Sequence, residues 1–327
     1  MTHNRQYRMP AEWEQQSMVQ LTWPHKDTDW APMLDEITTT YIQMAREIAK
    51  REPLLIVVPR RDDLPEEILS LGNTIIFECP TNDTWARDHG FLTIVECSAQ
   101  RSTSNTQRST LLDFQFNGWG KKFPAEKDNS INKHLWQSGI LSSLLAPHSS
   151  LLEIHYQDHN DFVLEGGSIE SDGRGTIYTT RCCLMAPNRN QPLTEQEIEE
   201  ELKRRLCADR IVWLDDEPLP GDDTDGHIDT IARITPDGTL LRLPLPDPIL
   251  DEDGTQLPAT YANYLIINGA VLIPTYNQPE NDQRAIRLIQ AVFPDREMVP
   301  IDSSSIIKQH GSIHCCTMQY YYIGNSD

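Results

Sequence analysis

The stretch Thr224-Asp225-Gly226-His227-Ile228-Asp229 places a histidine and carboxylates around one glycine, downstream of a strand-like run. Three other stretches likewise combine glycine with functional side chains next to strand-like runs. They are Arg87-Asp88-His89-Gly90, Glu165-Gly166-Gly167-Ser168 and His310-Gly311-Ser312-Ile313-His314-Cys315. We call these four stretches the tips. Because repeated units packed about an axis bring equivalent loops to one end, we expect the four tips to converge on one site.

Helical and strand-like patterns are mixed along the whole chain. Leu34 to Ile48 keep the apolar spacing of a helix, Thr194 with Glu197 forms a capping box, and a third helix begins near Asn281. The strand-like runs are Leu54 to Val58, Thr74 to Phe77, Thr176 to Thr179, Arg210 to Leu214, Leu265 to Ile267, Val271 to Ile273 and Met318 to Tyr322. This mixture predicts the α/β class. No low-complexity linker divides residues 1–327, although a chain of this length permits one to three domains.

The net charge argues against several classes of partner, and the spacing of the cysteines argues against a disulfide framework and a zinc site. The net charge of -21 argues against nucleic acid and anionic membranes, which require an excess of Lys and Arg. No apolar run approaches the roughly 20 residues of a spanning helix. Four of the seven cysteines lie in the pairs Cys182-Cys183 and Cys315-Cys316, a spacing that suits neither a secreted disulfide framework nor a CxxC zinc site. We therefore expect a cytoplasmic protein.

The cysteine and histidine of the tips allow more than one chemistry. Cys315 is a candidate nucleophile, because a thiolate attacks well near neutral pH, although a free cysteine is more often a small buried hydrophobe. In a strand, His227 and Asp229 would point to the same face. That pair suits an acid/base histidine beside a carboxylate that anchors substrate, a metal site, or a structural histidine. Local spacing leaves these alternatives open.

The remaining acids suggest a site for a flat cation. Glu165 could orient a histidine, or its two glycines could mark only a turn. Asp88 could form a local ion pair with Arg87, or it could bind a cation beside the aromatic wall of Trp85. A planar guanidinium presents N–H donors in fixed forks, and Asp88 with Asp229 could clamp it.

The tips, in this order, resemble the agmatine deiminase family of the guanidine-modifying pentein superfamily, which includes bacterial peptidylarginine deiminase-like proteins. The resemblance runs from Met9-Pro10-Ala11-Glu12-Trp13-Glu14 to the Cys315 tip and includes Trp85-Ala86-Arg87-Asp88. It implies a fold of five ββαβ units arranged as a five-bladed propeller, in one domain without cofactor or metal. The chain departs from the family at Gly90-Phe91, where the family has proline, and at His310-Gly311-Ser312.

The resemblance also implies a role for each site residue. Cys315 is the nucleophile, because it directly follows the histidine of the family's motif, and Cys316 stands where an apolar residue is usual. His227 is the general acid/base and Glu165 its partner, while Asp88 and Asp229 clamp the guanidinium. Trp85 resembles the wall beside the aliphatic chain. Asp223 stands where the family places an acid, commonly Glu, for the distal amine.

These expectations define a hydrolase that converts agmatine into N-carbamoylputrescine and ammonia through a covalent cysteine intermediate. The alternatives are a peptidylarginine or arginine deiminase, a metal-dependent hydrolase with His227, Asp229, Asp88 and Glu165 as ligands, and a non-catalytic guanidinium or polyamine binder. The expected partner is a small cationic guanidino compound, with neither nucleic acid nor membrane. The sequence does not decide the oligomeric state, so a homo-oligomer stays open.

Overall fold

The computed structural model describes residues 6–97, 107–145 and 152–321. In this part of the chain five sheets form, with helices around them. The sheets are β1-β5-β6-β7 (Tyr7–Arg8, Leu92–Glu96, Gln107–Gln115, Leu152–Val163), β10-β9-β8 (Arg210–Leu214, Thr176–Thr180, Ile169–Ser171), β11-β12 (Arg233–Ile234, Leu240–Leu241), β13-β14-β15 (Leu265–Ile267, Ala270–Thr275, Glu297–Asp302) and β16-β2-β3-β4 (Thr317–Tyr320, Met18–Thr22, Leu54–Val58, Thr74–Glu78). The α/β class is confirmed.

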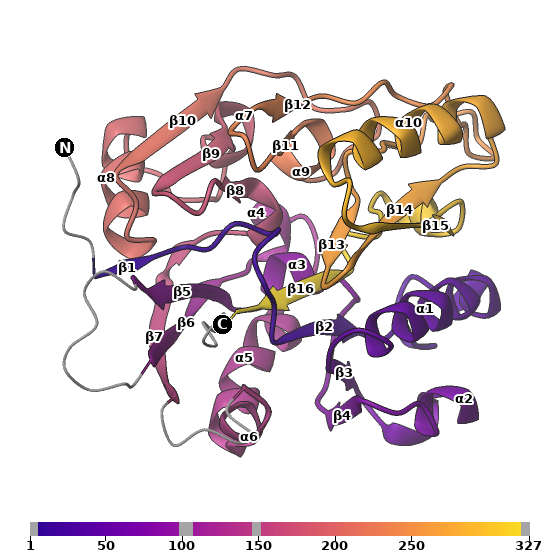
Figure 1. Cartoon of the computed structure of the whole chain (residues 1–327), viewed down its shortest axis with the longest axis horizontal. Helices are drawn as coiled ribbons and strands as arrows, with labels where there is room; N and C mark the ends of the chain where they lie inside the picture. The colour runs from indigo at the N-terminus through magenta and orange to yellow at the C-terminus, as the bar shows by residue number, and fades with distance from the viewer. Residues whose placement is uncertain (1–5, 98–106, 146–151, 322–327) are drawn as a thin grey trace.

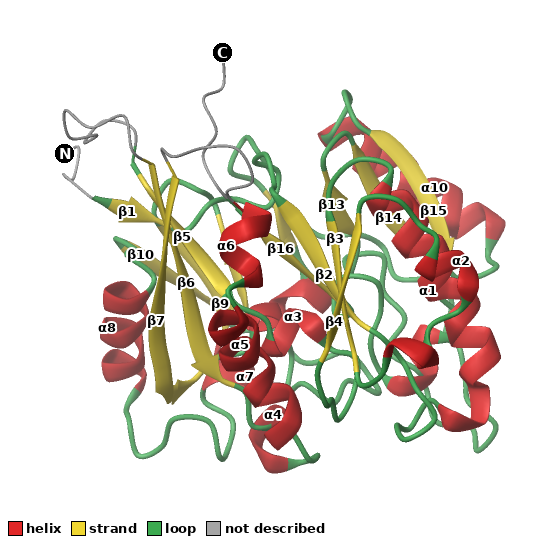
Figure 2. Ribbon diagram, turned by 90° about the horizontal axis from the view of Figure 1, so that it is seen from below, coloured by secondary structure: helices red, strands yellow, loops and turns green. Residues whose placement is uncertain are grey.

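The longer helices lie at the periphery of the molecule, whereas the short helix α3 (Ala86–His89) lies near its middle (Figure 1). The outer helices are α1 (Leu34–Ala49), α5 (Glu126–Ser138), α8 (Glu195–Arg205) and α10 (Pro279–Val292). Figure 2 shows α8 and α1 at opposite ends of the molecule with strands between them. The capping box at Thr194 and Glu197 is present at the start of α8, as predicted. In the described residues we find no helix with the length and apolarity that crossing a membrane requires.

Four sheets share one strand pattern. In each, the first strand pairs antiparallel with the second, and the second pairs parallel with the third, as in β5-β6-β7 and β8-β9-β10. The same pattern recurs in β13-β14-β15 and in β16-β2-β3, while β11-β12 is an antiparallel pair. Parallel pairing requires a crossover, and the helices α1, α8 and α10 supply three of them.

A short turn of helix precedes the first strand of several sheets, and these turns are the predicted tips. They are α3 (Ala86–His89) ahead of β5, η4 (Gly166–Ser168) ahead of β8, α9 (Ile228–Ile231) ahead of β11, and a turn closed by Thr317 N donating to His314 O ahead of β16. The remaining short helices are α2 (Glu66–Leu69), α4 (Gly118–Lys121), α6 (Ile140–Leu145), α7 (Arg181–Leu184), η1 (Ala31–Met33), η2 (Arg61–Asp63) and η5 (Ile306–Gln309).

The expected strand around His227 and Asp229 is wrong. His227 precedes α9, and Asp229 lies in its only turn. Asp225 and Gly226 both adopt left-handed backbone angles, with φ of 65° and 92°, which end any extended run. The hydroxyl of Thr224 then accepts a hydrogen bond from His227 N at 2.9 Å. The two side chains still reach the same region, but through a turn and not through strand alternation.

Candidate active site

Cys315 lies in the turn between η5 and β16, and its backbone is held by residues from two other parts of the chain. Asn263 Oδ1 accepts hydrogen bonds from the amides of His314 and Cys315, at 3.0 and 3.2 Å. The carbonyl of Cys315 accepts from Arg87 N at 3.1 Å. The side chain lines a cavity of ≈ 150 Å³, whereas Cys316 is fully buried in the core that includes α1. Of the two adjacent cysteines, Cys315 is therefore the one that lines the cavity.

Asp88 from one tip, and His227 and Asp229 from a second tip, converge on Gly167 of a third tip. A Cβ atom at Gly167 would lie 2.6 Å from His227 Nδ1, 2.9 Å from Asp88 Oδ1 and 3.1 Å from Asp229 Oδ2. Only glycine leaves room for all three side chains at this position. Asp229 Oδ2 also lies 3.8 Å from Cys315 Sγ. The structure therefore brings together four of the residues that the sequence singled out.

Asp88 is oriented by two donors. Gly167 N donates to Oδ1 at 3.0 Å, and Trp119 Nε1 donates to Oδ2 at 2.9 Å. His227 Nδ1 lies 3.6 Å from Oδ1. Arg87, the neighbour that could have formed a local ion pair with Asp88, instead contacts Glu12 at 3.2 Å. The Asp88 carboxylate therefore forms no ion pair with Arg87; it lines the cavity and lies next to His227.

Trp119 reaches Asp88 from a left-handed turn. Gly118, Trp119, Gly120 and Lys121 all have positive φ, between 54° and 82°. A Cβ atom at Gly118 would lie 2.2 Å from the carbonyl oxygen of Phe123, so the turn requires glycine there. Asn117 Oδ1 accepts from Gly120 N at 2.9 Å and holds the turn closed. The indole lines the cavity next to Trp85, with ring centroids 6.3 Å apart.

Glu165 lies behind His227 and forms no hydrogen bond with it. Its Oε1 atom lies 2.8 Å from Arg189 Nε, and both side chains are fully buried. Arg189 also donates to Asp225 Oδ2 and to the carbonyl of Thr224, so it connects the Glu165 and His227 tips. In the described residues neither ring nitrogen of His227 has a hydrogen-bond partner. The predicted orientation of His227 by Glu165 is therefore not made through a direct hydrogen bond in this structure.

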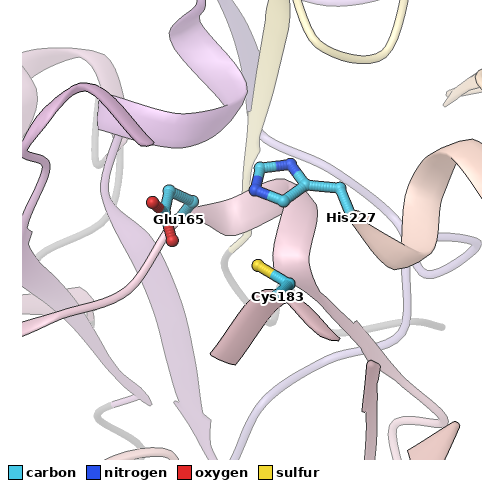
Figure 3. Close-up of side chains that lie close together, drawn as sticks. All are labelled: Glu165, Cys183 and His227. Atoms are coloured by element: carbon cyan, nitrogen blue, oxygen red, sulfur yellow. The ribbon is translucent and has the colours of Figure 1, made fainter. Parts of the chain in front are cut away.

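Glu165, His227 and Cys183 point toward one another (Figure 3). One donor atom from each lies within 4.8 Å of the others, a set of residue types that can bind zinc. The guanidinium of Arg189 already neutralises Glu165 at this point and would repel a divalent cation. The metal ligands proposed from the sequence included Asp88 and Asp229, which are not members of this group.

The mouth of the cavity is acidic and aromatic. Its lining includes Trp85 and Asp223, as the resemblance implied, and the tip residues Thr224, His310 and Gly311. It also includes residues that the sequence did not single out: Asp29, Asp83, Trp119, Phe123 and Gln309. The Asp223 carboxylate is 41% exposed and lies 3.7 Å from His310 Nδ1. No Lys or Arg is found among the described residues that line the cavity.

Burial and neighbouring charges shift the acids of the site in different directions. Burial, with added repulsion from Asp229 and Glu165, raises the pKa of Asp88, although the charge of His227 opposes the shift. Burial also opposes ionisation of Asp229, but the hydrogen bond and charge of His314 lower the pKa of this carboxyl below its usual value. Burial, Asp229 and Asp88 together raise the pKa of the Cys315 thiol well above its usual value. A cation between the two aspartates would offset both negative charges and favour the thiolate.

The sequence missed the residues that connect the tips. A fifth tip, residues 260–264 ahead of β13, carries Asn263, but it contains no glycine and so lacked the recurring signal. Trp119 had a usable signal, because a tryptophan between two glycines after a strand predicts a left-handed turn that presents an aromatic ring. Arg189 had none, because nothing nearby in the chain distinguishes it from other loop arginines.

Comparison with known proteins identifies the family. The model of the Porphyromonas-type peptidyl-arginine deiminase family matches residues 8–242 and 238–320. An agmatine deiminase of Pseudomonas savastanoi pv. phaseolicola is 29% identical, over 96% of this chain and 95% of its own length. The structure of C. jejuni agmatine deiminase with substrate bound is 30% identical with a TM-score of 0.86, covering 98% of both chains. A Porphyromonas gingivalis structure with the provisional description of an arginine deiminase is 39% identical with a TM-score of 0.81, covering 97% of this chain and 100% of its own. The chain belongs to the Porphyromonas-type peptidyl-arginine deiminase family.

Proposed function

We propose that this protein is an agmatine deiminase that hydrolyses agmatine to N-carbamoylputrescine and ammonia through a covalent intermediate on Cys315. The observation that carries the proposal is the convergence of Cys315, Asp88, Asp229 and His227 beside one acidic cavity. The relatives and solved structures that are described as agmatine deiminases support it.

In this proposal the two aspartates hold the guanidinium of the substrate next to the thiol. Asp229 Oδ1 is a buried acceptor without a partner in the described residues, and a guanidinium N–H can satisfy it. Asp88 is already oriented by Trp119 and Gly167 and retains further lone pairs. Because the bound cation offsets both carboxylates, substrate binding itself promotes ionisation of Cys315.

The reaction then proceeds in two halves. The thiolate attacks the guanidinium carbon, a C–S bond forms, and His227 gives a proton to the departing nitrogen as the C–N bond breaks and ammonia leaves. A thiouronium-type adduct remains. His227 next removes a proton from water, and the resulting hydroxide attacks the same carbon. The C–S bond then breaks to return the thiolate, and the hydroxyl proton leaves to solvent as the ureido carbonyl forms. One water is consumed for each ammonia released, and two moderate barriers replace one high barrier.

The charge of the cavity favours agmatine over free arginine. Agmatine is cationic at both ends, and the cavity lining carries Asp29, Asp83 and Asp223 in addition to Asp88. An arginine carboxylate requires a cationic partner, which the described lining lacks. Lys122 lies nearby, but it contacts Asp225 Oδ1 and the carbonyl of Asp223, each at 2.7 Å. We assign Asp223 to the distal ammonium and Trp85 to the wall of the aliphatic chain.

We further propose that the five sheets are the blades of one five-bladed domain, with the tips at its centre. The shared strand pattern and the convergence of equivalent turns support this arrangement. A cytoplasmic location is the matching expectation, because the adjacent pairs Cys182-Cys183 and Cys315-Cys316 do not suit a secreted disulfide framework.

A substrate panel tests the function. Purified protein should release ammonia from agmatine much faster than from free arginine or an arginine-containing peptide, and the reverse preference would overturn the substrate assignment.

Cys315→Ser should abolish ammonia release, while calorimetry should show that agmatine still binds. Cys316→Ser is the matched control that should remain active. Activity that resists chelators would argue against the metal-dependent hydrolase. Mass spectrometry of His227→Ala with agmatine should detect the adduct, and unmodified Cys315 in an active enzyme would contradict the mechanism.

A further inference from the structure

His314, the residue before the proposed nucleophile, lies between two carboxylates. Its Nδ1 atom lies 2.7 Å from Asp229 Oδ2, and its Nε2 atom lies 2.8 and 3.0 Å from the two oxygens of Glu12. The side chain is 1% exposed, so water cannot satisfy either nitrogen from bulk solvent. These contacts join the N-terminal segment, α9 and the Cys315 tip at one buried ring.

The two contacts together decide the protonation of the ring. A neutral imidazole has one N–H group and one lone pair, so it can donate to only one of the two carboxylates. The lone pair would then face a carboxylate oxygen within 3.0 Å, which is repulsive. Glu12 also forms ion pairs with Arg233 and Arg87, and these two guanidinium groups favour its ionised form without any contribution from His314.

Other charged groups surround this ring and do not reverse the conclusion. Arg233 Nη2 lies 3.3 Å from His314 Nε2, farther than either oxygen of Glu12. Arg233 itself forms ion pairs with Glu12 and Glu170, and Arg87 contacts Glu12 and donates from Nε to the His314 carbonyl at 3.4 Å. Burial raises the pKa of Glu170 to about 7. Both guanidinium groups are therefore paired with carboxylates, and Glu12 contacts both of them as well as the His314 ring.

We propose that His314 is held as an imidazolium between Glu12 and Asp229, and that it is a positioning residue for the guanidinium clamp. This inference rests on the proposed function. The ring occupies Asp229 Oδ2 and fixes the rotation of the carboxylate. Oδ1 is then left as the buried acceptor that receives a substrate N–H. The imidazolium also keeps Asp229 ionised without contacting substrate, so its effect on turnover passes through Asp229.

A measurement on the resting protein tests the protonation independently of activity. Nitrogen-15 NMR of protein labelled at histidine reports whether each ring nitrogen carries a proton, and His314→Gln assigns the resonance. We expect both ring nitrogens of His314 to carry a proton in the folded protein near neutral pH, because each faces a carboxylate. One protonated and one bare nitrogen at that pH would overturn the inference. If the imidazolium is found in a protein that does not deiminate agmatine, the proposed function fails and the assignment of His314 stands.

The kinetics of His314→Gln test the positioning role. Loss of a charged hydrogen bond to Asp229 should lower kcat/KM for agmatine about tenfold or more, raise KM, and move the acid limb of the pH profile to higher pH. The matched control is His89→Gln, because His89 is also buried and follows Asp88, but its ring contacts the Thr22 hydroxyl and, among the described residues, forms no hydrogen bond with a carboxylate. An unshifted acid limb in a folded His314→Gln protein, or the same shift in His89→Gln, would refute the role.

Discussion

Replacing Trp119 with phenylalanine should weaken catalysis by removing one hydrogen bond while keeping the aromatic wall. Trp119 Nε1 donates to Asp88 Oδ2 at 2.9 Å in a buried setting, and a hydrogen bond to a charged group contributes about 1.5–3 kcal/mol. At about 1.4 kcal/mol per factor of ten, kcat/KM for agmatine should fall about 10- to 150-fold. The same hydrogen bond lowers the pKa of Asp88, so its loss should move the acid limb of the pH profile upward.

Ammonia release from agmatine, measured across a range of pH, gives both kcat/KM and the position of the acid limb of the pH profile. Trp213→Phe is the matched control, because it also removes an indole hydrogen bond to a carboxylate, Glu199 Oε2 at 3.0 Å, outside the cavity lining. It should change kcat/KM less than twofold, and thermal unfolding should show that both variants are folded. A Trp119→Phe enzyme with wild-type kcat/KM and an unchanged pH profile would show that Asp88 does not depend on this donor.

Three further predictions concern residues outside the clamp. Asn263→Ala removes the acceptor for the amides of His314 and Cys315, so kcat should fall about tenfold or more. The affinity for agmatine, measured in the Cys315→Ser background, should change little. An equal loss of kcat and of affinity would contradict a role at the nucleophile alone. Burial raises the pKa of Glu52 from 4.5 to about 7, so this carboxyl destabilises the fold as pH rises through 7. Glu52→Gln should therefore stabilise the protein by up to about 3 kcal/mol near pH 8 and by nothing below pH 4.5, measured by denaturant unfolding; a pH-independent difference would refute the shift. Cys183→Ser should leave turnover within twofold, and added zinc should affect Cys183→Ser and Cys182→Ser equally, because Arg189 already neutralises Glu165. Stoichiometric binding of zinc that requires Cys183 would contradict this prediction.

Local sequence rules predicted the elements that depend on local physics. Leu54–Val58 and Arg210–Leu214 are strands with the predicted bounds, because continuous or alternating apolar runs of that length have few other ways to be buried. The capping box at Thr194 depends on residues three positions apart, so it too could be predicted. Elsewhere the tertiary structure overrode local spacing. The strand geometry considered for His227 and Asp229 is replaced by a turn that leads into α9.

The sequence by itself determined which side chains gather at the site, since four recurring tips carry Asp88, Glu165, His227, Asp229 and Cys315. Only the tertiary structure decided how those side chains are held. Asn263, Trp119 and Arg189 each contact a tip from a distant part of the chain, and such pairings leave no periodicity in the sequence. The position of the His314 ring is of the same kind, because it depends on contacts with two carboxylates that are 85 and 302 residues away in the chain. Charge pairing in a buried site is a property of distances in space, and the order of residues along the chain does not encode those distances locally.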